Sequence, residues 1–184
     1  MKSTQRPWMR GPQGTSRVKP GSSREGKPLV FTLGVDAIRQ LLAEREPALM
    51  LREATSPALD PGTGRWFMVA RGAVPLSFCE GHFPLRPIAP MAALGLFIGQ
   101  ACCLAASYAL GQECPQTIHY AAFEANGIRL RGRHGIPADR TIEARVFVGC
   151  RRGPIWQGGG ELGEADSPSV FSIEHIGMAP MSYP

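Results

Sequence analysis

His82 is the residue whose type and neighbourhood most clearly indicate chemistry. It lies in the segment Gly81-His82-Phe83-Pro84, a few residues before a long run without charge. An imidazole titrates near neutrality and can act as a general base. A histidine before a helix also commonly caps that helix or packs against it, and this is the alternative interpretation. We therefore take His82 as the best candidate for a catalytic residue.

The other titratable side chains show no pattern typical of a metal site or a disulfide framework. His119, His134 and His175 lack metal-ligand spacing, and we interpret them as structural or surface residues. The five cysteines are an odd set without a Cys-x-x-Cys pair, which is typical of a reducing compartment. We therefore expect no metal, no cofactor and a cytoplasmic location.

A long apolar segment follows His82 and must help to position it. No charged residue occurs from Ile88 to Leu110. By length this segment could span a membrane, but it also fits a helix buried on all sides in a soluble fold. Small residues are frequent in it, prolines crowd its start and strand-like segments follow it. We therefore predict a buried helix and no membrane association.

The segments around this apolar run predict a sheet. Residues 35–43 have the spacing of a short amphipathic helix. Extended segments are predicted from their composition and alternation at residues 48–51, 65–74, 119–130, 141–148, 155–162 and 170–176. An antiparallel sheet that wraps one apolar helix satisfies this order of elements. The predicted fold class is therefore α+β, in a single domain.

Composition supports one domain preceded by a basic leader. The 184 residues include 43% hydrophobic residues, and the formal net charge is +5. Residues 1–28 hold seven basic residues and one acidic residue, so the remainder is nearly neutral. We expect a flexible leader at 1–28 and a domain at 29–184, with a transit sequence or a nucleic-acid arm as alternatives for the leader.

The segment Gly81–Pro90 resembles the GHFPxxPxxPG signature of the 3-hydroxyacyl-acyl carrier protein dehydratases. Supporting similarity extends to that family's first helix and strand, central helix, later arginine-rich strand and hairpin, at Ile38–Leu51, Gln100-Ala101, Ile128–Asp139 and Arg151–Trp156. The resemblance implies a hot-dog fold, in a dimer or an assembly of dimers. It also implies substrates carried as thioesters on acyl carrier protein or coenzyme A, in fatty-acid or polyketide metabolism.

The same resemblance assigns roles to residues around the motif. His82 matches the histidine that removes or returns a substrate proton, while backbone amides at the helix start polarise the thioester carbonyl. We expect the substrate to contact Phe83, Pro90, Met91, Ala92 and Leu96. Two positions depart from the family pattern. Leu96, fourteen residues after His82, occupies the position of the family's acid, and Met91 replaces the glycine after the last proline.

Because leucine cannot donate a proton, the dehydratase site is incomplete within this chain. Glu80 or Glu124 could act as the acid, or the partner subunit of a heterodimer could supply it. Alternatively, the protein is a thioesterase, a catalytically incomplete subunit or a binder of acyl chains. The favoured interpretation is a dehydratase-like enzyme with His82 as the base.

Two further sets of residues have alternative interpretations. Arg129, Arg131 and Arg133 alternate along one strand; they are either a solvated edge or, with Arg86, a docking surface for an acidic carrier protein or a phosphate. No stacking aromatic residues alternate with these arginines, so we expect no nucleic acid as a partner. Gly95 and Gly99 either allow a strand to approach the helix closely or leave room for an acyl tunnel.

Overall fold

The computed structural model describes residues 30–82, 85–111, 119–131, 135–153, 155–165 and 167–181. The expected leader at 1–28 lies outside the described residues. The elements follow in the order β1 (Thr32–Gly34), α1 (Val35–Leu41), β2 (Leu51–Thr55), β3 (Ala58–Asp60), β4 (Arg65–Gly72), the 3-10 helix η1 (Leu76–Cys79), α2 (Met91–Gly111), β5 (Tyr120–Leu130), β6 (Ile142–Arg152), β7 (Ile155–Glu164) and β8 (Phe171–Pro180).

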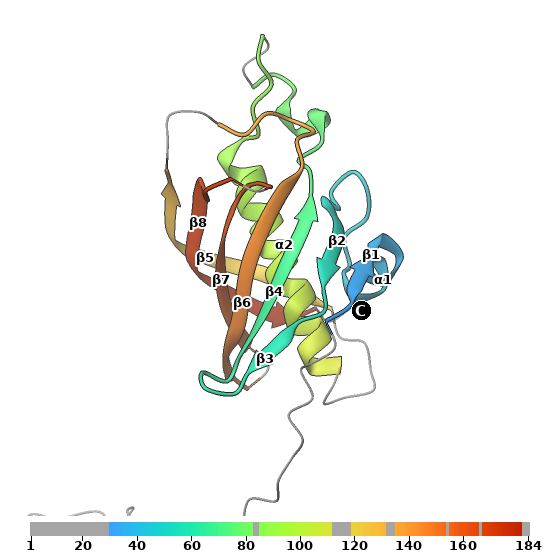
Figure 1. Ribbon diagram of the computed structural model, residues 1–184, viewed down its shortest axis with the longest axis vertical. Helices are drawn as coiled ribbons and strands as arrows, with labels where there is room; N and C mark the ends of the chain where they lie inside the picture. Colours follow the sequence, from blue (N-terminus) through green and yellow to red (C-terminus); the bar gives the residue numbers. More distant parts are fainter. Residues whose placement is uncertain are drawn as a thin grey trace, which may run out of the picture.

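The strands form one antiparallel sheet that curls around α2. The sheet has eight strands in the order β1-β2-β4-β6-β7-β8-β5, and β3 pairs with β4. Six strands contact α2, namely β2, β4, β5, β6, β7 and β8, and the helix lies behind β4 and β6 in Figure 1. The predicted α+β architecture, with one sheet wrapped around one helix, is therefore confirmed.

Burial explains why α2 contains no charge. By length and hydropathy it could cross a membrane, but 83% of its most apolar window is buried inside the fold. A helix surrounded by sheet has no solvent-facing stripe along most of its length, so it needs no polar face. The predicted buried helix is confirmed.

The residues of β6 show how the sheet meets the helix. Ile142, Ala144, Val146 and Val148 are all buried, and they alternate with more exposed residues as the two-residue period of a strand requires. The hairpin from β6 to β7 turns at Gly153, whose φ of 59° lies in the left-handed region that favours glycine. The alternation agrees with the extended segment predicted at 141–148, and the turn agrees with the hairpin expected at Arg151–Trp156.

The sequence predicts two strands before the long helix, whereas the structure has four. The two additional strands, β1 and β3, are three residues long and pair with β2 and β4, respectively. A strand of three residues is too short to show an alternation of apolar and polar side chains. Its existence depends on the neighbouring strand, so local pattern could not reveal it.

Candidate active site

His82 lies in the loop between η1 and α2, which projects at the top of Figure 1 in green. The residue is exposed, and its backbone N–H donates to the Cys79 carbonyl oxygen at 2.9 Å, which closes a turn after η1. Gly81 has a φ of 76°, a conformation that costs a residue with a Cβ more than it costs glycine. This turn therefore fixes the position from which the His82 side chain projects. Phe83 lies outside the described residues.

The turn at 136–139 fixes the second half of the motif loop. Ala89 donates its backbone N–H to Ile136 at 2.8 Å, and Ala138 donates to Pro87 at 3.0 Å. The Pro90 carbonyl oxygen then accepts from the first turn of α2. The family-like Pro-x-Asp turn thus has a structural role, because it holds the start of α2 in a defined position.

The start of α2 exposes apolar residues, in contrast to the rest of the helix. Met91 is 54% exposed and Leu96 is 39% exposed, and Ala92 is exposed as well, while Pro90 is half-buried. Apolar side chains left at the surface of the helix that follows a candidate base indicate a surface that a ligand or another subunit covers. Four of the five residues expected to contact substrate therefore lie together at this end of α2.

A cavity of about 230 Å³ lies between α2 and β5. A Cβ added at Gly99 would lie 3.6 Å from the Ala122 Cβ, and one at Gly95 would lie 3.8 Å from the Ile173 Cδ1, both ordinary contacts. Close approach of a strand therefore does not require glycine at either position. Both glycines line the cavity, with Ala122, Phe123, Glu124, Ala125 and Ile176. This geometry favours the second interpretation, in which they leave room beside the helix.

The two carboxylates considered as replacement acids differ in position. Glu80 is exposed and immediately precedes the motif. Glu124 is exposed on β5, accepts from the Asn126 side-chain amide at 2.6 Å and lines the same cavity as Gly95 and Gly99. The helix position that carries the family's acid is occupied by the apolar Leu96. Of the two carboxylates, only Glu124 lines this cavity.

The arginines lie at one edge of the sheet and in the motif loop. β5 is the last strand of the sheet, as the edge interpretation requires. Arg129 on this strand forms an ion pair with Glu174 of β8, whereas Arg131 and Arg86 are exposed. Arg133 lies outside the described residues. A docking role for the arginines stays a prediction.

The buried thiols are poor nucleophiles. Burial raises the pKa of Cys103 to about 12, and it raises the pKa of Cys102 well above its ordinary value. Burial also raises the pKa of Cys79, with a smaller contribution from the charge of Asp139. Among the described residues, no group of histidine, cysteine and carboxylate side chains is arranged to hold a metal ion. His82 is therefore the candidate that the geometry leaves for proton transfer.

A single helix wrapped by an antiparallel sheet, with a histidine loop at the helix start, defines a protein of the hot-dog class. The chain is similar in fold to the dehydratase heterocomplex ApeI:P from Xenorhabdus doucetiae, with a TM-score of 0.61, 7% sequence identity and coverage of 79% of this chain and 91% of that chain. This likeness concerns the fold. No protein-family profile matches the sequence.

Sequence comparison with curated proteins defines the family. The 3-hydroxyacyl-[acyl-carrier-protein] dehydratase FabZ of Anaeromyxobacter sp. (strain Fw109-5) is 32% identical over 150 residues, which cover 79% of this chain and 89% of that protein. FabZ of Escherichia coli O9:H4 (strain HS) is 31% identical over 123 residues, which cover 66% of this chain and 78% of that protein. The chain belongs to the FabZ family of 3-hydroxyacyl-[acyl-carrier-protein] dehydratases.

Proposed function

We propose that the protein is a dehydratase-like enzyme that acts on 3-hydroxyacyl thioesters carried by acyl carrier protein or coenzyme A. The observation that carries this proposal is the exposed His82 in the loop before α2, together with the exposed apolar residues Met91, Ala92 and Leu96 in the first turns of that helix. Membership of the FabZ family supports the substrate class. The family relationship also supports a cytoplasmic location.

In the proposed reaction, His82 takes the proton from the carbon next to the thioester carbonyl. Negative charge develops on the carbonyl oxygen, and the free N–H groups of the first turn of α2 stabilise it. The carbon–carbon double bond then forms while the carbon–oxygen bond to the 3-hydroxyl breaks. The hydroxyl leaves as water after it receives a proton from an acid.

The leaving hydroxyl must receive this second proton from an acidic side chain. We propose Glu124, or a carboxylate of a partner subunit, because Leu96 has no proton to donate. β5 is the outer strand on this side of the sheet and exposes large apolar side chains, with Phe123 at 58%, Ile128 at 48% and Leu130 at 56%. An apolar edge strand is suited to pairing with a second subunit. Glu124 would then lie at the subunit boundary.

The cavity beside Gly95 and Gly99 is the proposed site for the acyl chain. It is lined mainly by small and apolar residues, four of which belong to β5 or β8. An apolar pocket beside the helix that follows the histidine loop suits a ligand with a reactive thioester and a hydrocarbon tail.

A coupled assay on the purified protein with 3-hydroxyacyl and enoyl thioesters of several lengths tests the proposal. Loss of a general base lowers the rate by roughly 10²–10⁴-fold, and we expect a loss in this range for His82→Ala. Glu124→Gln should lower the rate comparably if Glu124 is the acid, whereas Glu80→Gln should leave it unchanged. Turnover by His82→Ala at the rate of the unaltered protein would refute the role of His82.

A catalytically incomplete subunit is the second candidate function, and the apolar Leu96 is the observation that favours it. In this case the purified protein binds thioesters without converting them until an active partner is added. Leu96 is 39% exposed, so a longer polar side chain fits there without burial of a charge. Leu96→Glu should then produce dehydration that Leu96→Gln does not, and that His82→Ala removes. Full activity of the unaltered protein alone would refute this second candidate.

A further inference from the structure

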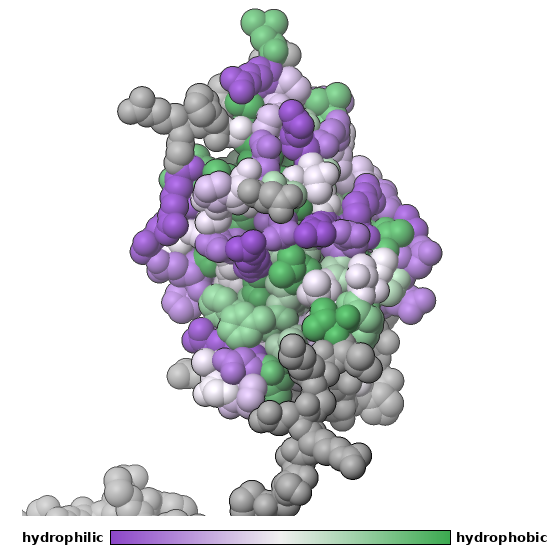
Figure 2. Space-filling model, viewed as in Figure 1, coloured by the Kyte–Doolittle hydropathy of each residue, from purple (hydrophilic) through white to green (hydrophobic). Residues whose placement is uncertain are grey.

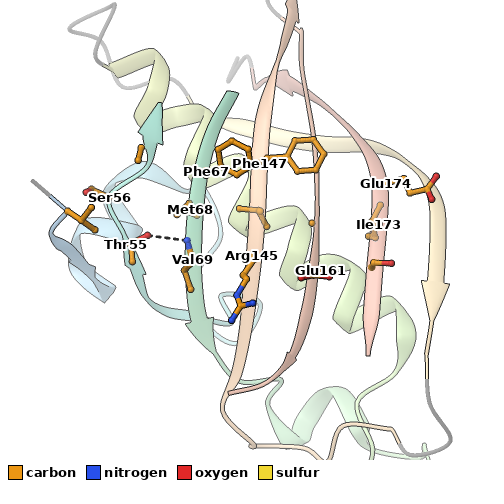
Figure 3. A pocket seen from close by; sticks show the side chains of 15 residues that line it. Thr55, Ser56, Phe67, Met68, Val69, Arg145, Phe147, Glu161, Ile173 and Glu174 are labelled. Carbon is orange, nitrogen blue, oxygen red and sulfur yellow. Dashed lines mark hydrogen bonds between the residues drawn. The ribbon is translucent and has the colours of Figure 1, made fainter. Parts of the chain in front are cut away.

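A groove with a volume of about 620 Å³ lies on the face of the sheet that is turned away from α2 (Figure 3). Phe67 on β4 and Phe147 on β6 point into it, with ring centroids 6.3 Å apart. Their neighbours Met68, Val146 and Val148 are buried against the helix. Because side chains alternate across a strand, the two phenylalanines lie on the opposite face.

The side chains that line the groove are largely apolar. Phe67 is 44% exposed, and Thr55, Ala58 and Val69 complete the wall beside it. Figure 2 shows this face of the molecule, with an apolar patch below a band of hydrophilic side chains. Contiguous apolar surface bordered by charged residues is typical of a site that another segment covers.

Glycines on β7 lie at and beside the groove. Gly159 pairs with Phe147, and a Cβ at Gly159 would lie only 2.5 Å from the Glu174 carbonyl oxygen. The close approach of β8 therefore requires glycine at this position. Gly160 forms part of the groove lining.

The chain itself enters at one end of this groove. Val30 lines the groove and is 61% exposed. The next residue is held in place, because the Phe31 N–H donates to the Ser56 Oγ at 3.2 Å and the Ser56 N–H donates to the Phe31 carbonyl oxygen at 2.7 Å. Whatever precedes Val30 in the sequence therefore starts at the edge of the groove.

We propose that residues 24–29 of the same chain occupy this groove and cross it from β2 towards β8. Leu29 packs near Phe67, and Arg24 reaches the carboxylates of Glu161 and Glu174, which line the far side. Neighbouring strands are about 4.8 Å apart, so the four steps from β2 to β8 span about 19 Å. The six residues 24–29 cover about 20 Å when extended.

Charge and tethering favour this occupant over a second copy of the chain. Residues 1–28 carry seven basic residues against one acidic residue. On the far side of the groove, Glu174 pairs with Arg129, but its side chain is 47% exposed and can accept a second cation. A segment joined to the edge of the groove has an effective concentration in the millimolar range, which a separate chain does not reach. The covered groove would then be closed to other partners.

Trypsin cleavage of the full chain tests this docking. The rate of cleavage after Arg24 is measured by mass spectrometry and divided by the rate after Arg17, which lies beyond the reach of the groove and serves as an internal reference. Docking protects Arg24, so this ratio should rise at least five-fold in Phe67→Thr. Leu59→Thr is the matched control, because Leu59 is 48% exposed on β3 but does not line the groove. Its ratio should stay at the value of the unaltered protein.

A second variant, Leu29→Asp, changes the segment and not the sheet, so it should raise the ratio while the fold stays intact by circular dichroism. If Phe67→Thr fails to fold, this variant by itself tests whether the segment docks in the groove. Equal ratios in the unaltered protein and in Leu29→Asp would overturn the proposal. So would a fall in sedimenting mass for Phe67→Thr at an unchanged cleavage ratio, because a second copy would then occupy the groove.

Discussion

At the scale of residues, Gln100 shows how a polar side chain is accommodated in an apolar helix. It is buried, its Oε1 accepts from the Met50 N–H at 3.1 Å, and its Nε2 donates to the Ala48 carbonyl oxygen at 2.7 Å. Both amide groups are therefore paired, and they join α2 to the chain just before β2. The Gln-Ala pair that resembles the family's central helix thus has a structural reason that does not depend on catalysis.

Cys103 gives a testable dependence of stability on pH. Its pKa is raised to about 12 by burial, with the charge of Glu44 as a second cause, against 9.0 for an ordinary thiol. Below pH 9 the thiol is protonated in both states and costs nothing. Between pH 9 and 12 the unfolded chain loses this proton while the folded chain keeps it, so the stability falls as pH rises.

We expect the free energy of unfolding to fall more steeply above pH 9 in the unaltered protein than in Cys103→Ala. The difference in slope is at most about 1.4 kcal/mol per pH unit, because one thiol is involved. Denaturant unfolding at pH 8, 9, 10 and 11 measures both slopes, and only the slopes are compared since the alanine leaves a cavity. Parallel profiles would contradict the assignment.

At the scale of elements, two glycines of similar appearance in the sequence serve different purposes. Gly159 lies where β7 and β8 approach too closely for a side chain, whereas Gly99 lies on α2 next to a cavity. Glycine is therefore required at position 159 by the packing of the backbone, whereas glycine at position 99 leaves open space beside the helix.

Alanine at these two glycines should therefore change stability in opposite directions. Gly159→Ala places a Cβ 2.5 Å from a backbone oxygen and should lower the free energy of unfolding by roughly 1–3 kcal/mol. Gly99→Ala should raise it by up to about 1 kcal/mol, because alanine favours a helix and its Cβ meets only ordinary contacts. Urea unfolding measures both. If the cavity holds the acyl chain, Gly99→Ala should also lower turnover more for long substrates than for short ones.

At the scale of the whole molecule, β5 determines whether the proposed site is complete. This strand ends the sheet, and its exposed Phe123 lines the cavity together with Glu124. An assembly through this edge would cover Ile128 and Leu130, which are otherwise exposed.

Introducing charge at this edge should separate the subunits. We expect the unaltered protein to sediment as a dimer or a larger assembly, and Ile128→Lys with Leu130→Lys to sediment as a monomer because the lysines repel and resist burial. Leu59→Lys on β3 is the control and should keep the assembly. Analytical ultracentrifugation gives the masses, and a monomeric unaltered protein would contradict assembly through β5.

Much of the fold could be predicted from local pattern alone. The uncharged run before Gly111 indicated the buried helix, and the alternation in β6 indicated which of its faces is buried, because both signals come from neighbouring residues in the chain. His82 could be singled out for the same reason, since its motif is contiguous. The departure at Leu96 was also visible in the sequence, because the expected acid lies at a fixed spacing from the histidine.

Only the tertiary structure decided the remaining features, since they depend on residues far apart in the sequence. β1 and β3 exist through pairing with β2 and β4, and β5 is an edge strand because β8 pairs with its other side. The cavity at Gly99 requires β5 to lie beside α2, and the groove at Phe67 requires β4 and β6 to be neighbours. Sequence patterns report the propensity of one segment, whereas cavities and edges arise from the order in which strands pair.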